Sequence, residues 1–158
     1  MPQTLETATS IIRVDLPKLK RNIEKIRAHI GPNVEIIYVA KSNGYGNGIA
    51  EPAVYMRDHC GIRRFATSQI GEALQLREAG ITEPILILSA VPFSAVPEFV
   101  RQDFTATVYD DSFPHALAAE ARRQGKRVKV HIKLDTGLPR IGLAPRAPLA
   151  HLIGALRA

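Results

Sequence analysis

The spacing of hydrophobic residues changes along this chain from a helical period to short continuous runs. In the first segment, apolar side chains recur every three or four residues, at Leu16, Leu19, Ile23, Ile26 and Ile30. This spacing places them on one face of a helix over residues 16–30, and Asp15 stands where an N-cap is expected. Gly31 and Pro32 then end the helix.

Short apolar runs separate the helical segments of the chain. They predict strands at 34–40, 64–67, 85–89, 105–108 and 128–134. Helices are predicted between them, one over 68–80 and one over 112–125 that opens at Asp111 or Ser112, and residues 148–158 indicate the beginning of another. Strands that alternate with helices are typical of a parallel sheet, so the predicted fold class is α/β.

Composition limits the kind of protein without identifying it. The chain is 46% apolar, and no apolar run approaches the ~20 residues that cross a bilayer, so no membrane partner is expected. Residues 1–10 have neither a basic start nor an apolar core, which predicts a disordered lead and a cytoplasmic location. The single cysteine, Cys60, cannot form an internal disulfide, and beside Gly61 at a helix end it is expected to be a buried filler.

The net charge of +6 raises the alternative of nucleic-acid binding. The cations of the first helix lie beside its apolar stripe and are expected to form a solvated face: Lys18, Lys20, Arg21, Lys25 and Arg27. No aromatic-rich RNA-binding signature accompanies them, so nucleic acid is not an expected partner; salt-dependent retention on DNA would revive it. The five histidines fall at no metal-ligand spacing, and no metal site is predicted.

The residues directly after the first predicted strand carry the strongest sign of chemistry. They read Lys41-Ser42-Asn43-Gly44-Tyr45-Gly46-Asn47-Gly48. The three glycines allow a sharp turn close to a ligand, with a lysine at its start. A desolvated lysine can form a Schiff base with an aldehyde such as pyridoxal phosphate. The alternative is a solvated strand-end lysine beside an ordinary glycine-rich turn.

A second motif spans the last predicted strand and the residues after it, Val130 to Gly142. Because side chains alternate along a strand, His131, Lys133 and Asp135 share one face and leave the apolar residues on the other. A polar face within a helix-covered sheet indicates a wet interior or an active site. An exposed edge strand with a solvated face fits the same pattern.

Together the two motifs resemble the alanine racemase family of pyridoxal-phosphate enzymes. That family has Val-x-Lys at a strand end, then Tyr-Gly-x-Gly, and later Lys-x-Asp-Thr-Gly-x-x-Arg-x-Gly. Further segments are similar to its second and third barrel units: Phe65–Ser68, Glu72-Ala73, Leu76–Ile81 and Pro84–Leu88. The resemblance covers the chain from Ile12 onward.

The resemblance implies roles for four residues. Lys41 would hold pyridoxal phosphate as an internal aldimine and then move the α-proton of the substrate. Tyr45 would pack near this cofactor and bond its phosphate. Arg140 would contact the phenolic oxygen of the cofactor and the carboxylate of the substrate, and Lys133 matches a lysine that is carbamylated in many members and positions this arginine. The alternative is that Lys133 is paired with Asp135 or solvated.

The resemblance implies that the protein interconverts L- and D-alanine, which is a small-molecule substrate. It also implies a homodimer in the full-length family. The opposing subunit of that homodimer supplies a tyrosine as the second base. Departures from the family pattern at Ser42, Asn43, Gly44 and Asn47 affect substrate preference more than cofactor attachment. Another pyridoxal-phosphate barrel enzyme is the alternative, either a serine, lysine or broad-specificity racemase or an amino-acid decarboxylase. A non-catalytic truncated remnant is the third reading.

The length of the chain bears on the architecture. A (β/α)₈ barrel of the TIM type takes ~250 residues, whereas this chain has 158 and about five βα units. Residues 11–158 are therefore expected to form a truncated, N-terminal portion of a pyridoxal-phosphate-binding barrel. The C-terminal half of the barrel and a C-terminal β domain would be absent, and the isolated chain would be inactive. A half-barrel that dimerises is less favoured, because a bare sheet edge promotes aggregation.

Overall fold

The computed structural model describes residues 10–144, 152–154 and 156. Apart from Ser10, the expected disordered lead lies outside the described residues. Most of the helix expected at 148–158 lies outside them too. The described residues in that stretch, 152–154 and 156, are helical, and Leu152 is buried.

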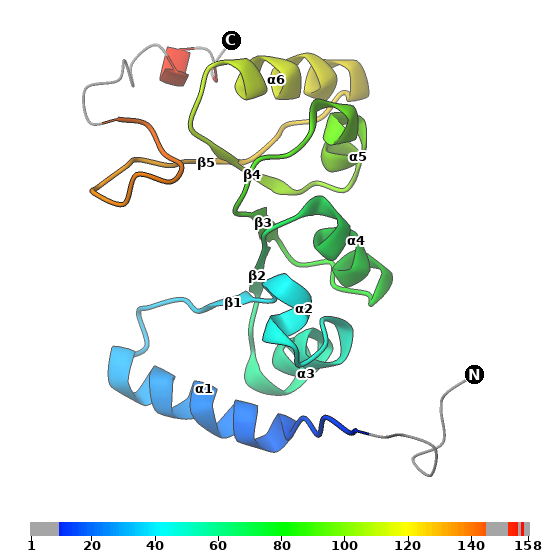
Figure 1. The fold of residues 1–158 in the computed structure, drawn as a ribbon, viewed down its shortest axis with the longest axis vertical. Coiled ribbons are helices and arrows are strands. Elements are labelled where there is room, and N and C mark those ends of the chain that lie inside the picture. Colours follow the sequence, from blue (N-terminus) through cyan, green and yellow to red (C-terminus); the bar gives the residue numbers. More distant parts are fainter. Residues whose placement is uncertain (1–9, 145–151, 155, 157–158) are drawn as a thin grey trace.

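Five parallel strands form one sheet in chain order (Figure 1): β1 (Ile37–Val39), β2 (Arg64–Thr67), β3 (Ile85–Ile87), β4 (Thr105–Val108) and β5 (Val130–Ile132). The predicted parallel α/β sheet is confirmed, and the bounds of β2 and β4 match their predictions. β1, β3 and β5 are shorter than predicted. For β1 the reason is its partner, since β2 starts opposite Ile37 and leaves residues 34–36 without a strand to pair with.

Helix α1 (Leu16–Ile30) precedes the first strand. The helices that connect the strands are α2 (Lys41–Tyr45), α3 (Ala50–Cys60), α4 (Ile70–Glu78), α5 (Val96–Arg101) and α6 (Ser112–Gln124). A 3₁₀ turn, Phe93–Ala95, leads into α5. The sequence analysis gave no bounds for α3 or α5, because each carries a proline in its first turn, which a helix start tolerates but which hides the apolar period. No helix in the described part of the chain is long and apolar enough to span a membrane.

The helix starts show which predicted caps are right. Asp15 caps α1 as predicted: its Oδ1 accepts from the Lys18 N–H at 2.9 Å, and this bond lowers the pKa of Asp15. α6 begins at Ser112 with Asp111 as its N-cap residue, as predicted. The carboxylate that accepts from the N–H groups of Ser112 and Phe113, at 2.9 Å each, belongs to Asp110 rather than to Asp111.

One face of the sheet is covered by helices. Phe65, Ile85, Ile87 and Val108 point to this face and are at most 1% exposed. They pack in one cluster with residues of the covering helices: Met56, Leu76, Phe99 and Leu117. Cys60 at the end of α3 belongs to the same cluster, as predicted, and burial raises the pKa of its thiol.

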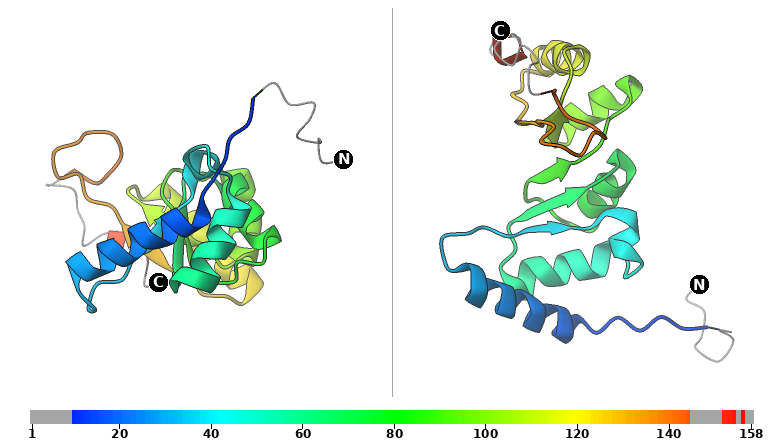
Figure 2. Two further views of the ribbon diagram at one scale, coloured as in Figure 1. Left: turned by 90° about the horizontal axis from the view of Figure 1, so that it is seen from below. Right: turned by 60° about the vertical axis from the view of Figure 1, so that its left-hand side comes forward.

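Of the predicted polar row, His131, Lys133 and Asp135, only His131 lies within β5, and it points to the opposite face of the sheet. Partners in a parallel ladder point to the same side, so the pairing of Thr107 with His131 places both on the face opposite Val108. Figure 1 shows α4 and α5 on one side of the strands and the loop after β5 on the other, and Figure 2 shows this loop projecting from the body of the fold. His131 is exposed, and β5 is an edge strand of the described sheet.

Candidate active site

Lys41 lies directly beyond the carboxyl end of β1. The residue before it, Ala40, is fully buried, and its N–H donates to the Ala66 carbonyl at 2.8 Å. This bond continues the pairing of β1 with β2 one residue past the strand. Lys41 itself is partly buried. The carboxyl ends of parallel strands are where α/β proteins build ligand sites, so the lysine stands in the position that the sequence predicted for it.

The backbone after Lys41 makes a left-handed turn. The φ angles of Ser42, Asn43, Gly44, Tyr45 and Gly46 are 54°, 52°, 60°, 55° and 86°. Glycine adopts this conformation without penalty, as the sequence analysis expected of the glycine-rich octet. That Ser42, Asn43 and Tyr45 adopt it as well was not foreseen, and the left-handed conformation costs an L-residue roughly 1–2 kcal/mol.

Hydrogen bonds within the turn close it on itself. The Gly44 N–H donates to the Ala40 carbonyl at 3.0 Å, and the Gly48 N–H donates to the Asn43 carbonyl at 3.0 Å. The side-chain amide of Asn47 donates to the Gly44 carbonyl at 2.9 Å. Asn47 is one of the departures from the family pattern, and here it stabilises the turn by bonding its backbone.

One carboxylate ties this turn to the turn after β2. The Ser42 N–H donates to Oε1 of Glu72 at 2.6 Å, while Oε2 accepts from the N–H groups of Ser68 and Gln69 at 3.0 and 3.1 Å. A hydrogen bond to a charged group contributes ~1.5–3 kcal/mol, which is comparable with the cost of one left-handed residue. Glu72 therefore offsets part of the strain in the turn.

No role for Glu72 is apparent from the sequence alone. The one indication in the sequence is spacing. Glu72 follows Gln69 by three residues, which is the spacing of a carboxylate that accepts from backbone N–H groups at the start of a helix. The structure starts α4 at Ile70, two residues later than predicted, with Gln69 as its N-cap. Spacing within one segment cannot reveal that the same carboxylate reaches Ser42.

The side chain of Lys41 extends over the ring of Tyr45. Its Nζ lies 5.8 Å from the ring centroid, within the range of a cation–π contact. Tyr45 is 62% exposed, so its ring and hydroxyl stand at the surface beside the amine. Among the described residues, the amine of Lys41 has no hydrogen bond or ion pair to a carboxylate. The amine is therefore not neutralised by a neighbouring acid of the described chain.

The second motif forms a loop that leaves β5 and returns to it. The Lys133 N–H donates to the Val108 carbonyl at 2.9 Å, and the Leu143 N–H donates to the Lys133 carbonyl at 2.8 Å. The return path runs so close to the chain that a Cβ on Gly142 would lie 2.7 Å from the backbone nitrogen of Asp135. No other residue fits at position 142 without a backbone shift, which explains the last glycine of the motif.

Lys133 and Arg140 line the same pocket of about 170 Å³ within this loop. Lys133 is partly buried and Arg140 is exposed. The alternative pairing of Lys133 with Asp135 is not seen: no ion pair joins them in the described part of the chain, and Asp135 Oδ1 instead accepts from the Gly137 N–H at 2.8 Å. The loop therefore places two cationic groups around one small polar pocket.

The two motifs follow opposite edges of the sheet. Lys41 comes after β1 and the Lys133–Arg140 pocket after β5, with three strands between them. Lys41 does not line that pocket. Each half of the candidate site thus forms separately, and among the described residues no hydrogen bond or ion pair joins the two.

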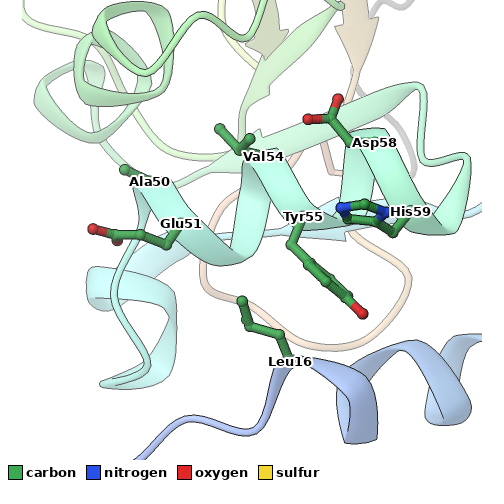
Figure 3. A pocket seen from close by; sticks show the side chains of 7 residues that line it. All are labelled: Leu16, Ala50, Glu51, Val54, Tyr55, Asp58 and His59. Carbon is green, nitrogen blue, oxygen red and sulfur yellow. The ribbon is translucent and has the colours of Figure 1, made fainter.

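A larger cavity, of about 310 Å³, lies elsewhere, between the start of α1 and α3 (Figure 3). Figure 3 shows Leu16 pointing up from α1 and Tyr55 pointing down from α3 into the space between them. The Tyr55 and His59 rings pack with their centroids 4.6 Å apart. None of the four predicted site residues lines this cavity, so it is a groove between helices and not part of the candidate site.

Comparisons with known proteins agree with this geometry. The family model described as "Alanine racemase, N-terminal domain" matches residues 14–158. Alanine racemase 1 of Caldanaerobacter subterraneus subsp. tengcongensis is 40% identical over 131 residues, which are 83% of this chain and 34% of that protein. The chain thus spans about a third of the length of the curated relatives it matches.

Solved structures give the same result. An alanine racemase of Clostridium difficile 630 matches with a TM-score of 0.85 and 30% identity, covering 90% of this chain and 37% of that chain. A histidine racemase from Leuconostoc mesenteroides subsp. sake matches with a TM-score of 0.81 and 26% identity, covering 90% and 38%. Sequence and fold therefore agree, and the chain belongs to the alanine racemase family, whose N-terminal domain it matches.

Proposed function

We propose that this chain contributes the cofactor lysine of an amino-acid racemase that interconverts L- and D-alanine with pyridoxal phosphate. The observation that carries the proposal is the place of Lys41. Its amine stands at the carboxyl end of β1, at the start of a left-handed turn held by hydrogen bonds on both sides of the residue. Family membership supports the cofactor, because alanine racemases are pyridoxal-phosphate enzymes.

The side chains of the two motifs fit this cofactor and an amino acid chemically. A lysine amine can bond covalently to an aldehyde, the exposed Tyr45 hydroxyl can donate to a phosphate, and the planar fork of Arg140 suits a carboxylate or a phenolate. Lys133 lines the pocket of Arg140 and would position it, as a carbamate or as an amine.

When bound, pyridoxal phosphate supplies an electron sink that makes the α-proton of an amino acid easier to remove. The Nζ of Lys41 would take that proton from one face of the substrate in one direction of the reaction and would deliver a proton to this face in the reverse direction. Arg140 would hold the substrate carboxylate, which fixes the direction of the α-carbon. Inversion also needs a proton-moving group on the opposite face, for which we propose a tyrosine of the second subunit in a cytoplasmic homodimer.

Substrate preference has a second candidate. One structural neighbour is a histidine racemase, so the fold also accommodates a larger amino acid in a related protein. Residues 42–44 and Asn47 depart from the family pattern directly beside Lys41. Racemisation assays of the complete gene product with alanine, serine, lysine and histidine would rank these substrates.

Reduction with borohydride in the presence of pyridoxal phosphate tests the role of Lys41 directly. We expect peptide mapping to place the reduced cofactor on Lys41, and Lys41→Ala to lose this label because the covalent step is lost. Lys129→Ala is the matched control, since it removes an exposed lysine outside the two motifs and should leave the label in place. Label on another lysine with Lys41 unmodified would rule the proposal out.

A further inference from the structure

The carboxylate of Glu72, which follows β2, reaches the turn that follows β1. It lies in the first turn of α4, after β2, yet its Oε1 accepts from the Ser42 N–H, after β1, at 2.6 Å. Its other oxygen accepts from Ser68 and Gln69. One side chain thereby joins the carboxyl ends of two neighbouring strands.

These bonds surround Lys41 at the backbone. On the N-terminal side, the peptide group between Val39 and Ala40 is held by the Ala40 N–H, which donates to the Ala66 carbonyl of β2 at 2.8 Å. The peptide group after Lys41 is held by the Ser42 N–H on Glu72. Both anchors belong to the β2–α4 unit, so that unit fixes where the Cα–Cβ bond of Lys41 points.

The bond to Glu72 meets the backbone where the left-handed turn begins. Ser42, with φ 54°, is the first left-handed residue after Lys41. A residue in this conformation persists only when its surroundings over-determine it. Without the carboxylate, Ser42 can return to an ordinary conformation, and that rotation would re-aim the lysine that precedes it.

The geometry requires both carboxylate oxygens and the full length of a glutamate. Three N–H donors divide between two acceptors, one oxygen for the turn after β1 and the other for the start of α4. Glutamine offers a single acceptor oxygen and places an NH₂ group against an N–H donor. Aspartate keeps both oxygens but is one methylene shorter, so it can serve the start of α4 without reaching Ser42.

We propose that Glu72 is a positioning residue for Lys41: its carboxylate holds the left-handed turn in the conformation that presents the lysine amine to an aldehyde. The proposal rests on the role proposed above for Lys41. The contribution of Glu72 to the start of α4 can be separated from its positioning of Lys41, because the two functions use different carboxylate oxygens.

Glu72→Asp is the decisive variant, with Glu51→Gln as the matched control. Glu51 is an exposed acid in the first turn of the neighbouring helix α3 and has no hydrogen bond in the described part of the chain. Amide hydrogen exchange reports the backbone. In Glu72→Asp we expect the Ser42 amide to lose protection by roughly tenfold or more while Ser68 and Gln69 stay protected. Glu51→Gln should change none of the three.

Borohydride trapping measures how readily Lys41 reacts with the aldehyde. With pyridoxal phosphate and borohydride, we expect Glu72→Asp to lower the rate of label on Lys41 roughly tenfold, while any background label on Lys129, an exposed lysine outside both motifs, is unchanged. Glu72→Gln should give the same pattern more strongly. If it does not fold, the Asp variant decides alone. Unchanged Ser42 exchange and Lys41 trapping in Glu72→Asp would overturn the proposal.

The two proposals fail in different ways. If the wild-type chain takes no label on Lys41, the role of this lysine in cofactor binding fails, and the exchange of the Ser42 amide still shows whether Glu72 holds the turn. If Lys41 is labelled at the wild-type rate in Glu72→Asp, the lysine keeps its role and Glu72 loses its own.

Discussion

The turn after β1 and the loop after β5 carry the two halves of the candidate site, and the rest of the molecule holds them in different ways. Residues 40–48 are tied to the neighbouring β2–α4 unit through Ala66 and Glu72. Residues 133–143 bond mainly to one another, with one bond from the Lys133 N–H to the Val108 carbonyl of β4, and Arg140 is exposed.

This difference separates the covalent function proposed for Lys41 from the anion-binding function proposed for Arg140. Lys41 needs a fixed direction, and a strained turn supplies it because contacts from two βα units over-determine the backbone. The loop of Arg140 has a fixed path through Gly142 but no second unit among the described residues to hold its side chain. The first half of the site is therefore formed within the described residues, whereas the second half has only its backbone in place.

The largest expected effect concerns catalysis. We expect the 158-residue chain to show no racemisation of alanine with excess pyridoxal phosphate, because barrel active sites are assembled from several strand ends and here Lys41 and Arg140 follow opposite edges of a five-stranded sheet. Chiral chromatography of alanine after incubation measures this. Interconversion that disappears in Lys41→Ala would show that the two halves do meet.

The next prediction breaks the loop and leaves the turn intact. Gly142→Ala should cost about 1–3 kcal/mol locally, because the new Cβ would lie 2.7 Å from the Asp135 nitrogen and the backbone must move. Chemical shifts should change over residues 133–143 and stay constant over 40–48. Gly71→Ala is the control: nothing lies within 4 Å of its Cβ, and it should be neutral or stabilising. Shift changes that reach Ser42 would contradict the independence of the two regions.

A smaller effect tests the strain in the turn. Ser42→Gly should stabilise the fold by about 0.5–1 kcal/mol, since it removes a left-handed penalty of roughly 1–2 kcal/mol and adds the entropy cost of a glycine. Urea unfolding measures the change. Ser68→Gly is matched, because its N–H also donates to Glu72 but its φ is not positive, and it should destabilise slightly. Equal effects at both positions would mean that the turn is unstrained.

The smallest expected effect is the pH dependence of the stabilisation that Glu120 of α6 contributes to the fold. Hydrogen bonds from Arg123 and Gln124 lower the pKa of Glu120 on α6 from 4.5 to about 2. Because the folded pKa is depressed, the stabilisation is full above pH 4.5 and is lost as the pH falls toward 2. The difference in urea midpoint between wild type and Glu120→Gln should therefore shrink over this interval. A difference that stays constant from pH 7 to pH 2 would contradict the assignment.

The sequence by itself determined the order of the elements, the parallel α/β class and the lysine at the end of the first strand. These features follow from local conformational preferences, which the apolar periods, Asp15 and the glycines express. The folded structure keeps them because the pairing of neighbouring strands favours the same conformations. The two motifs also identified the family, because each motif is a set of residues at fixed spacings within one continuous segment of the sequence.

Only the tertiary structure decided how Lys41 is held and how far its site is complete. The bond from Ser42 to Glu72 joins residues 30 positions apart, and the left-handed conformation of Ser42, Asn43 and Tyr45 opposes their intrinsic preference. The distribution of Lys41 and Arg140 over opposite edges depends on the order of strands in the sheet. Such contacts depend on which segments the fold brings together, and no local pattern in the sequence records them.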